Sequence, residues 1–445
     1  MSDITVSNFF KDEFVDYASY STIRMIASSI DGLKNVNRKI IRTIIDKKIV
    51  NDKKVSQLNS IAAEYCEYLH GDMSDSISKM AQSYSGSNNL PLLAEEGSFG
   101  NRFINKPSAP RYIFTYGKPL MFSMFNANDN RVLTPQYFEG TEIEPTFYLP
   151  TLPMLLVNGS NGISSGFKQT ILGRNPDKIK KFLINKLEGA TTKFTAKPFY
   201  NGFKGTVVPG EELGKWVILG KIKKHNSTTV EIQDIPVGLE LGKYISILES
   251  LVDKKTITSY TDNSDKNIFN FTVKFKRAEL EKLTEDEILD RLKLKLKVSE
   301  TYTALDEDLK IKVFKNVNEI FNYYYDVKLK YLDIRKKLEL STLTEQITLL
   351  KSKWTFINMI VEDELIINKR TKIQIVNDIK DVKTIIQKND SYDYLLNMPI
   401  SQLTKENLTK LKSQIAEANK DIKTLKKKTV NEIWLDDLET LNLGK

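Results

Sequence analysis

Hydrophobic positions in the last third of the chain repeat at alternating intervals of four and three residues. One series consists of Ile320, Tyr324, Val327, Tyr331, Ile334 and Leu338. It is followed by Leu343, Ile347, Leu350, Trp354 and Ile357, and later by Leu408, Leu411, Ile415, Ala418, Ile422 and Leu425. This spacing is typical of coiled-coil helices. The repeat is lost over about residues 360–400, so we expect two long antiparallel helices with a small helical part at their far end.

The first third of the chain has helical patterning, and the middle has the patterning of strands. Residues 14–47 predict helix with one break, at the turn signal Asp31-Gly32, and residues 74–84 are also compatible with helix. Residues 216–220 and 228–233 have strand-like composition on either side of a polar turn at 225–227, and residues 267–275 alternate between apolar and polar. The middle therefore predicts an α+β module.

Composition and charge limit the kinds of partner and the cellular compartment that we expect for this protein. The chain has 445 residues, enough for several domains, with a net charge of +9. This balance favours a polyanionic partner such as nucleic acid, although a general bias toward lysine gives the same number. No apolar run approaches the roughly 20 residues of a membrane span, and no signal pattern precedes the first helix. The single cysteine, Cys66, fits a reducing cytoplasm, and we expect no membrane partner.

One tyrosine stands in a chemically suggestive setting. Tyr112 follows Arg111 directly and precedes a run that favours β-structure, and Arg102 and Lys106 lie just upstream. A tyrosine phenolate can form a covalent intermediate, but the phenol, with an ordinary pKa near 10, needs neighbouring cations or a base. Arginine also matches the geometry of phosphate oxygens. The alternative is an ordinary structural Arg-Tyr pair beside a strand.

Basic residues and a histidine mark a second region. Lys34, Arg38 and Arg42 are spaced to share one helix face, with Lys39 beside them, and such a stripe can follow a phosphate backbone or simply be solvated. His70 precedes Gly71-Asp72 at the expected start of a helix, where anions bind, although a lone histidine is often structural.

Two further features lie in the middle of the chain. Ile163 lies at the expected tip of a turn rich in glycine, asparagine and serine, either as a packing residue or as a wedge that enters a DNA base step. Asp306 and Asp308 have the spacing of a metal-binding pair, but they lie between helical patterns and we interpret them as a solvated turn. We expect no metal site, and no glycine-rich ATP-binding pattern occurs.

Residues 96–102 (EGSFGNR) and 108–115 (SAPRYIFT) together closely resemble the breakage-reunion site of type IIA DNA topoisomerases. The resemblance implies that Tyr112 attacks a DNA phosphodiester with Arg111 as its partner in the transition state. It places His70 near the scissile phosphate and makes Ile163 the DNA wedge. The other residues that we expect to bind DNA are Lys34, Arg38, Lys39 and Arg102. Asn35 replaces the proline usual in the family, and Leu69 replaces a second histidine found in many members.

The resemblance extends along nearly the whole chain in the same order and implies an α+β multidomain fold. A winged-helix DNA-binding domain with the catalytic tyrosine is expected at 1–140, and an α+β tower domain at 141–305. A long antiparallel coiled coil with a helical carboxy-terminal dimerisation gate is expected at 306–445, with the gate at about 358–402. Length and coverage favour a phage-encoded member of the family, which would work in the host cytoplasm.

The implied function is that of the DNA cleavage-religation subunit of an ATP-dependent type II topoisomerase. It makes a transient double-strand break through 5′-phosphotyrosyl links, and relaxes and decatenates DNA after strand passage. The expected partners are double-stranded DNA, a second copy of the chain in a homodimer, and a large subunit. That subunit carries the ATPase and the Toprim domain, holds ATP and Mg²⁺, and leaves no cofactor on this chain. The alternative is a non-catalytic DNA-binding scaffold with a coiled coil. The positive net charge and the heptad repeats are enough to suggest this alternative.

Overall fold

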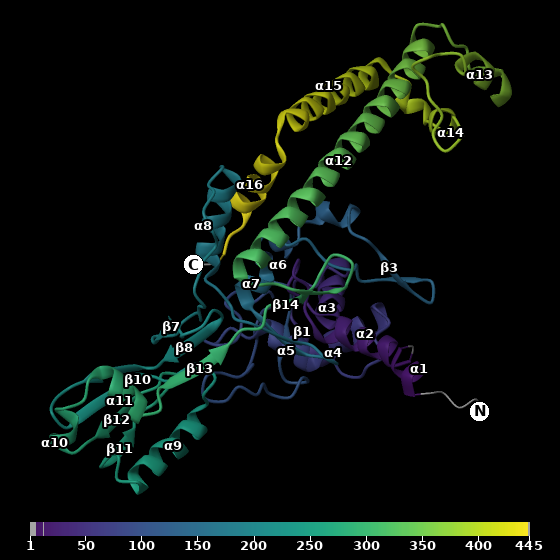
Figure 1. Cartoon of the computed structure of the whole chain (residues 1–445). Helices are drawn as coiled ribbons and strands as arrows, with labels where there is room; N and C mark the ends of the chain where they lie inside the picture. Colours follow the sequence, from purple (N-terminus) through teal and green to yellow (C-terminus); the bar gives the residue numbers. More distant parts are fainter. Residues whose placement is uncertain (1–5, 12, 444–445) are drawn as a thin grey trace. The chain divides into compact units, whose positions relative to one another are not determined.

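The computed structural model describes residues 6–11 and 13–443 (Figure 1). It consists of two compact units. The first runs to Lys328 and resumes at Trp434, and the second is Leu329–Ile433. This division does not test the three-domain boundaries expected from the sequence, which stay predictions.

The amino-terminal part of the first unit is helical, as its periodicity predicts. Its elements are α1 (Val6–Lys11), α2 (Glu13–Met25), α3 (Asn35–Asp46), α4 (Val55–Tyr65), α5 (Ser74–Ala81) and α6 (Pro119–Met124). The break between α2 and α3 is the predicted Asp31-Gly32 turn. Gly32 has φ +68°, and a Cβ there would lie 2.2 Å from the Leu155 amide nitrogen, so only glycine fits this close approach. Strands β1 (Lys53–Lys54) and β2 (Phe114–Thr115) pair antiparallel, with Lys53 opposite Thr115.

The segment after α6 carries short elements around a buried apolar run. These are η1 (Ala127–Arg131), β3 (Gln136–Phe138), β4 (Thr141–Ile143), α7 (Met154–Asn158), β5 (Ser160–Ile163), β6 (Lys168–Ile171) and α8 (Pro176–Leu187). Residues 154–157 of α7 are all buried, as their continuous hydrophobicity predicts. Strands β5 and β6 form an antiparallel hairpin in which Ile163 lies opposite Lys168.

The middle of the chain is an α+β module, as the alternating pattern predicts. Its strands are β7 (Thr206–Pro209), β8 (Lys215–Leu219), β9 (Lys221–Lys224), β10 (Thr229–Asp234), β11 (Ser259–Asp262), β12 (Phe271–Lys274) and β13 (Lys295–Ser299). Its helices are α9 (Leu241–Asp253), α10 (Arg277–Leu280) and α11 (Glu285–Arg291). One sheet has the order β11-β12-β10-β9 and the other β13-β8-β7. Tyr244 and Leu248 of α9 pack into one core with Val230, Ile232 and Phe271 of the first sheet.

The prediction that helical stretches flank Asp306 and Asp308 is wrong, although both residues do lie in a turn. They lie in the turn of a β-hairpin formed by β14 (Thr303–Leu305) and β15 (Ile311–Val313). The Asp306 carboxylate accepts hydrogen bonds from the amides of Asp308 and Lys310, each at 2.9 Å, so this side chain holds the turn.

Long helices follow. Most of the positions that the heptad pattern predicts to be covered are buried or half-buried in them. The elements are α12 (Val317–Val361), α13 (Lys372–Ile379), α14 (Asp393–Leu396), η2 (Ile400–Gln402), α15 (Lys405–Lys427) and α16 (Val430–Thr440). Within the second unit, α12 and α15 run antiparallel (Figure 1): Lys336 donates to the Lys428 carbonyl at 2.5 Å, while Leu350 and Leu408 share a core at the other end.

The seam predicted for α15 is the covered side of that helix, because its six members are buried or half-buried and nearly all other positions are exposed. The first seam of α12 is buried only as far as Tyr331. Ile334 and Leu338, which the heptad pattern also predicts to be covered, are exposed.

Candidate active site

Tyr112 lies on the surface, in a turn immediately before β2. Its side chain is 65% exposed, whereas that of the next residue, Ile113, is only 1% exposed. The Tyr112 amide donates to the Ala109 carbonyl at 2.9 Å, and the Ile113 carbonyl accepts from the Val55 amide at 3.0 Å. The backbone is therefore held to the start of α4 while the phenol stays accessible to a large substrate.

Arg111 covers the face of this tyrosine. Its guanidinium carbon lies 4.8 Å from the centroid of the Tyr112 ring, and its side chain is exposed. A cation over the ring is attracted to it, and it retains hydrogen-bond donors for a phosphate. The structure thus brings together the two residues to which the sequence assigns the chemistry.

The glycines of the EGSFGNR segment allow the chain to pass close to its neighbours. Gly100 has φ +90°, and a Cβ there would lie 2.6 Å from the Asn105 carbonyl oxygen. Gly97 has φ +107° and lies against Ile113, the buried residue next to Tyr112. A side chain at either position would displace the turn that presents the tyrosine.

The expectation that Arg102 contacts DNA is not supported by its surroundings. The side chain is buried, donates to the Ile235 carbonyl at 2.8 Å and lies 3.4 Å from the Asp234 carboxylate. It also lies 4.9 Å from the Phe269 ring centroid. Burial lowers the pKa of Arg102 and raises that of Asp234. Arg102 therefore joins the tyrosine segment to the α+β module, while Lys106 nearby is exposed.

The expected phosphate-following stripe on α3 also needs correction. Arg38 is buried and donates to the Asp31 carboxylate at 2.7 Å. Lys39 is buried too, and its ammonium donates to Glu144 at 2.8 Å and to the Cys66 carbonyl at 2.6 Å. Both charges are used inside the protein, since a buried cation must be paired. Direct contact with DNA does not agree with this burial.

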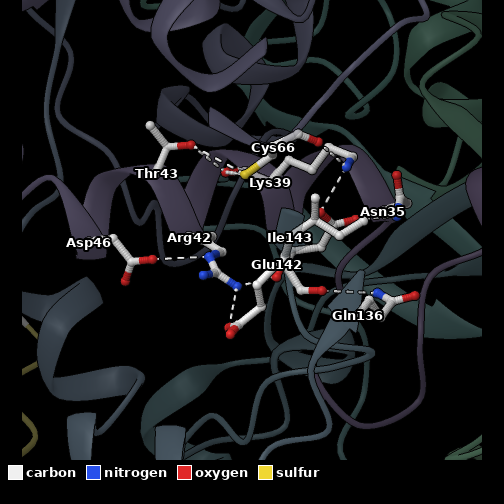
Figure 2. Close-up of polar contacts among 10 residues, drawn as sticks. Asn35, Lys39, Arg42, Thr43, Asp46, Cys66, Gln136, Glu142 and Ile143 are labelled. Atoms are coloured by element: carbon white, nitrogen blue, oxygen red, sulfur yellow. Dashed lines mark hydrogen bonds and ion pairs between the residues drawn. The ribbon is translucent and has the colours of Figure 1, made fainter. Parts of the chain in front are cut away.

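Arg42 is held by carboxylates at the surface. Figure 2 shows its guanidinium reaching Asp46 and Glu142, at 3.0 and 3.1 Å. The same view shows Lys39 directed to the Cys66 carbonyl. Periodicity placed these cations on one helix, and Asp46 lies four residues after Arg42 on it. It gave no sign of Glu142 and Glu144, which come from a distant part of the sequence.

Lys34 lies beside a groove of the first unit, and its contact with DNA stays a prediction. It is half-buried at the start of α3, and its ammonium donates to the Asn161 carbonyl at 2.7 Å. It lines a groove of about 530 Å³ together with Lys79, Asn88 and Asn161. Burial and the charge of Lys79 lower the pKa of Lys34. Lys79, near the end of α5, is a candidate that sequence reasoning missed, and its only signal was a lone lysine on an amphipathic helix.

His70 is exposed, in the loop between α4 and α5. Helix α5 begins at Ser74, where the sequence pattern predicts it, and the histidine precedes that start in the loop. The hydroxyl of Tyr20, on α2, is hydrogen-bonded to His70 Nε2. Tyr20 and its neighbour Arg24 were not selected from the sequence, because nothing in their spacing links them to a residue fifty positions away.

Ile163 is 71% exposed, at the last position of β5. The turn of the hairpin is formed by residues 164–167, in which the Ser164 amide donates to the Phe167 carbonyl at 2.9 Å. A Cβ on Gly162 would lie 2.2 Å from the Met25 carbonyl oxygen, so the hairpin lies close to the end of α2. An exposed isoleucine on a hairpin fixed in this way is available to a partner.

The fold of this chain matches that of a solved structure, which identifies the class of protein. The chain is similar to the crystal structure of the Plasmodium falciparum topoisomerase II DNA-binding, cleavage and re-ligation domain, with a TM-score of 0.86 and 31% identity. The match covers 99% of this chain and 64% of that one, and it confirms the α+β multidomain fold. The family model for the A-type subunits of DNA gyrase/topoisomerase IV matches residues 24–439, and the chain therefore belongs to this family.

Longer proteins are similar to this chain in sequence. The mitochondrial DNA topoisomerase 2 of Dictyostelium discoideum is 32% identical over 99% of this chain and 35% of its own length. DNA topoisomerase 2 of Plasmodium falciparum is 32% identical over 98% of this chain and 34% of its own. The chain thus spans about a third of the length of these relatives.

The described part of the chain lacks two kinds of feature. Within residues 6–11 and 13–443, no group of three His, Cys, Asp or Glu side chains is placed to hold a metal ion. In the same described residues, no helix has the length and apolar character needed to cross a membrane.

Proposed function

We propose that this chain is the DNA cleavage-religation part of a type II topoisomerase. The observation that carries the proposal is the exposed phenol of Tyr112 beneath the Arg111 guanidinium, within a segment that resembles the family's breakage-reunion site. Family membership and the likeness to a cleavage and re-ligation domain support it.

The proposed reaction is an exchange of phosphate esters. The phenolate oxygen of Tyr112 bonds to a DNA phosphorus, and the bond from that phosphorus to the 3′ oxygen breaks. The 5′ end is then held as a phosphotyrosyl ester. The leaving 3′ oxygen takes a proton from water, which balances the proton that the Tyr112 hydroxyl gives to water when the phenolate forms. Attack by the same 3′ hydroxyl reverses the step. Arg111 offers donors to the non-bridging oxygens, on which negative charge develops.

The DNA surface in this proposal comprises Lys34, His70 and Ile163. Lys34 and the newly found Lys79 offer charge to the backbone in one groove. Ile163 enters a base step and bends the duplex. Arg38, Lys39 and Arg102 act indirectly, through the buried ion pairs that hold α3 and the tyrosine segment in place.

Magnesium and ATP belong to other parts of the proposed enzyme. A phosphoryl transfer gains from a divalent cation that neutralises developing charge. The described residues do not fit such a site, because no group of three suitable ligands is close together. We therefore assign Mg²⁺ to a Toprim domain and ATP to an ATPase domain of a large partner subunit.

The proposal also includes a homodimer of this chain and the change in DNA topology that it produces. Two copies pair so that each Tyr112 cuts one strand, and a second duplex passes through the break. Relaxation and decatenation follow. Phage origin of the T-even type and action in the host cytoplasm remain part of this proposal.

A substitution tests the proposal directly. Tyr112→Phe removes only the hydroxyl, so covalent DNA adducts of the reconstituted enzyme should disappear while DNA binding persists. Tyr137→Phe is a matched control, since Tyr137 on β3 is 64% exposed, almost as much as Tyr112. Adducts that survive in the Tyr112 variant would refute the assignment.

A further inference from the structure

Tyr20 and His70 come from different elements and meet at the surface of the first unit. Tyr20 lies on α2 and His70 in the loop before α5. The Tyr20 hydroxyl is hydrogen-bonded to His70 Nε2, and the two ring centroids are 5.6 Å apart. Two separate contacts, one polar and one between rings, thus fix the imidazole relative to α2.

Other groups complete the surroundings of the imidazole. The Tyr68 ring approaches it edge-on, with centroids 5.7 Å apart at 74°. The Arg24 guanidinium carbon lies 5.4 Å from the Tyr20 ring centroid, one helical turn further along α2. Desolvation, followed by the positive charges of Arg24 and Lys39, lowers the pKa of His70, which favours the neutral ring.

A neutral imidazole carries one N–H, and the hydrogen bond at one nitrogen decides where that proton resides. Tyrosine hydroxyl can donate to an unprotonated Nε2, which leaves the proton on Nδ1. Among the described residues, this is the one hydrogen bond found for the His70 ring. Its Nδ1 therefore has no protein acceptor in that part of the chain and is free to donate to a ligand.

We propose that Tyr20 is a positioning residue for His70. Its hydroxyl donates to Nε2 and fixes the tautomer with the proton on Nδ1, so that the Nδ1–H group can donate to an oxygen of a DNA phosphate. The identity of the ligand, a DNA phosphate, rests on the proposed function. The tautomer of His70 does not, because it follows from the Tyr20 hydrogen bond. Leu69, the neighbour of His70, is 73% exposed and apolar, so it cannot supply the orienting hydrogen bond.

The tautomer can be measured on the full chain without DNA. The sequence contains two histidines, His70 and His225, so ¹⁵N-histidine labelling gives two imidazoles. We expect His70 as the Nδ1–H tautomer in the wild type and a shift toward Nε2–H in Tyr20→Phe, which keeps the ring. His225, which is hydrogen-bonded to Glu231 at 3.0 Å, should be unchanged and serves as an internal reference. An Nε2–H tautomer in the wild type would overturn the inference.

Cleavage by the reconstituted enzyme gives the functional test. Tyr20→Phe should lower the cleavage rate about tenfold, the effect of a misplaced catalytic group, with DNA affinity unchanged. Since a hydroxyl donating to Nε2 favours the neutral ring, its loss should raise the pKa of His70, which the ¹⁵N shifts of the labelled imidazole follow as the pH is changed. Arg24, Lys39 and Tyr68 remain in both proteins.

Tyr17→Phe is the control, because Tyr17 is an exposed tyrosine of the same helix whose ring lies beside that of Phe14, with centroids 6.4 Å apart. It should leave the cleavage rate and the tautomer and pKa of His70 unchanged. An unaltered rate and an unaltered His70 tautomer in Tyr20→Phe would overturn the inference while leaving the role of Tyr112 intact. Conversely, adducts that persist in Tyr112→Phe would refute the proposed function, while the tautomer measurement would stand by itself.

Discussion

Arg38 donates to both carboxylate oxygens of Asp31, at 2.7 and 3.3 Å, and both side chains are buried. Arg38→Met keeps much of the side-chain length but leaves the carboxylate unpaired. Removing one partner of a buried ion pair typically costs about 3–5 kcal/mol. We therefore expect a markedly lower midpoint for the unfolding transition of the first unit, measured by thermal or urea denaturation of the whole chain.

Arg277→Met is the control for that substitution. Arg277 is an exposed arginine of α10 with a surface partner, so its loss should change stability little. Equal stability of the Arg38 variant and the wild type, together with a shallower salt dependence of DNA binding, would restore Arg38 as a phosphate contact.

Ile163→Ala should reduce DNA bending more than DNA affinity. The wedge stabilises a kinked duplex, whereas charge supplies most of the binding. The end-to-end distance of a duplex labelled for fluorescence energy transfer measures the bend. Leu213→Ala is matched to it as an exposed apolar residue of the α+β module. A bend angle that is the same in the Ile163 variant and the wild type would rule out the wedge.

Cys66 should report unfolding of the helical part. Burial raises the pKa of the Cys66 thiol to about 11, so little thiolate exists at pH 8, and the side chain is also inaccessible. Because the native pKa is higher than that of a free thiol, alkylation should be slow in buffer and accelerate across the urea transition. Native protein that reacts as fast as a free thiol would contradict the packing around Lys39 and Thr43.

Plasmid relaxation separates the enzyme from the alternative of a scaffold. The proposed enzyme should relax DNA only when the large partner with its ATPase and Toprim domains, ATP and Mg²⁺ are all present, and Tyr112→Phe should abolish this activity. A scaffold role predicts that Tyr112 is dispensable and that the chain needs no partner ATPase. Relaxation by the Tyr112 variant at the wild-type rate would therefore favour the scaffold.

Features encoded by neighbouring residues were predictable from the sequence. The Arg111-Tyr112 pair is contiguous, so its geometry follows from one turn, and the seam of α15 follows from the heptad positions between Leu408 and Leu425. The Asp31-Gly32 break was likewise evident from local chemistry. In these cases a short stretch contains all the information that the structure uses.

Features that depend on distant partners were not predictable. Lys39 looked like a surface cation because Glu144, its partner, is 105 positions away. Arg102 likewise pairs with Asp234, in another part of the fold. Asp306 and Asp308 were placed between helices because two short strands flank them, which periodicity does not detect. Long-range pairing thus decides which cations are left for DNA.

Mapping the DNA-linked peptide tests the central claim most directly. Trypsin cuts after Arg111 and does not cut between Lys118 and Pro119, so the predicted adduct peptide spans residues 112–131 and contains Tyr112 and Tyr116. Fragment ions that separate these two tyrosines should place the nucleotide on Tyr112. A nucleotide on Tyr116, on any other residue, or no adduct with an enzyme that relaxes DNA, would contradict the account.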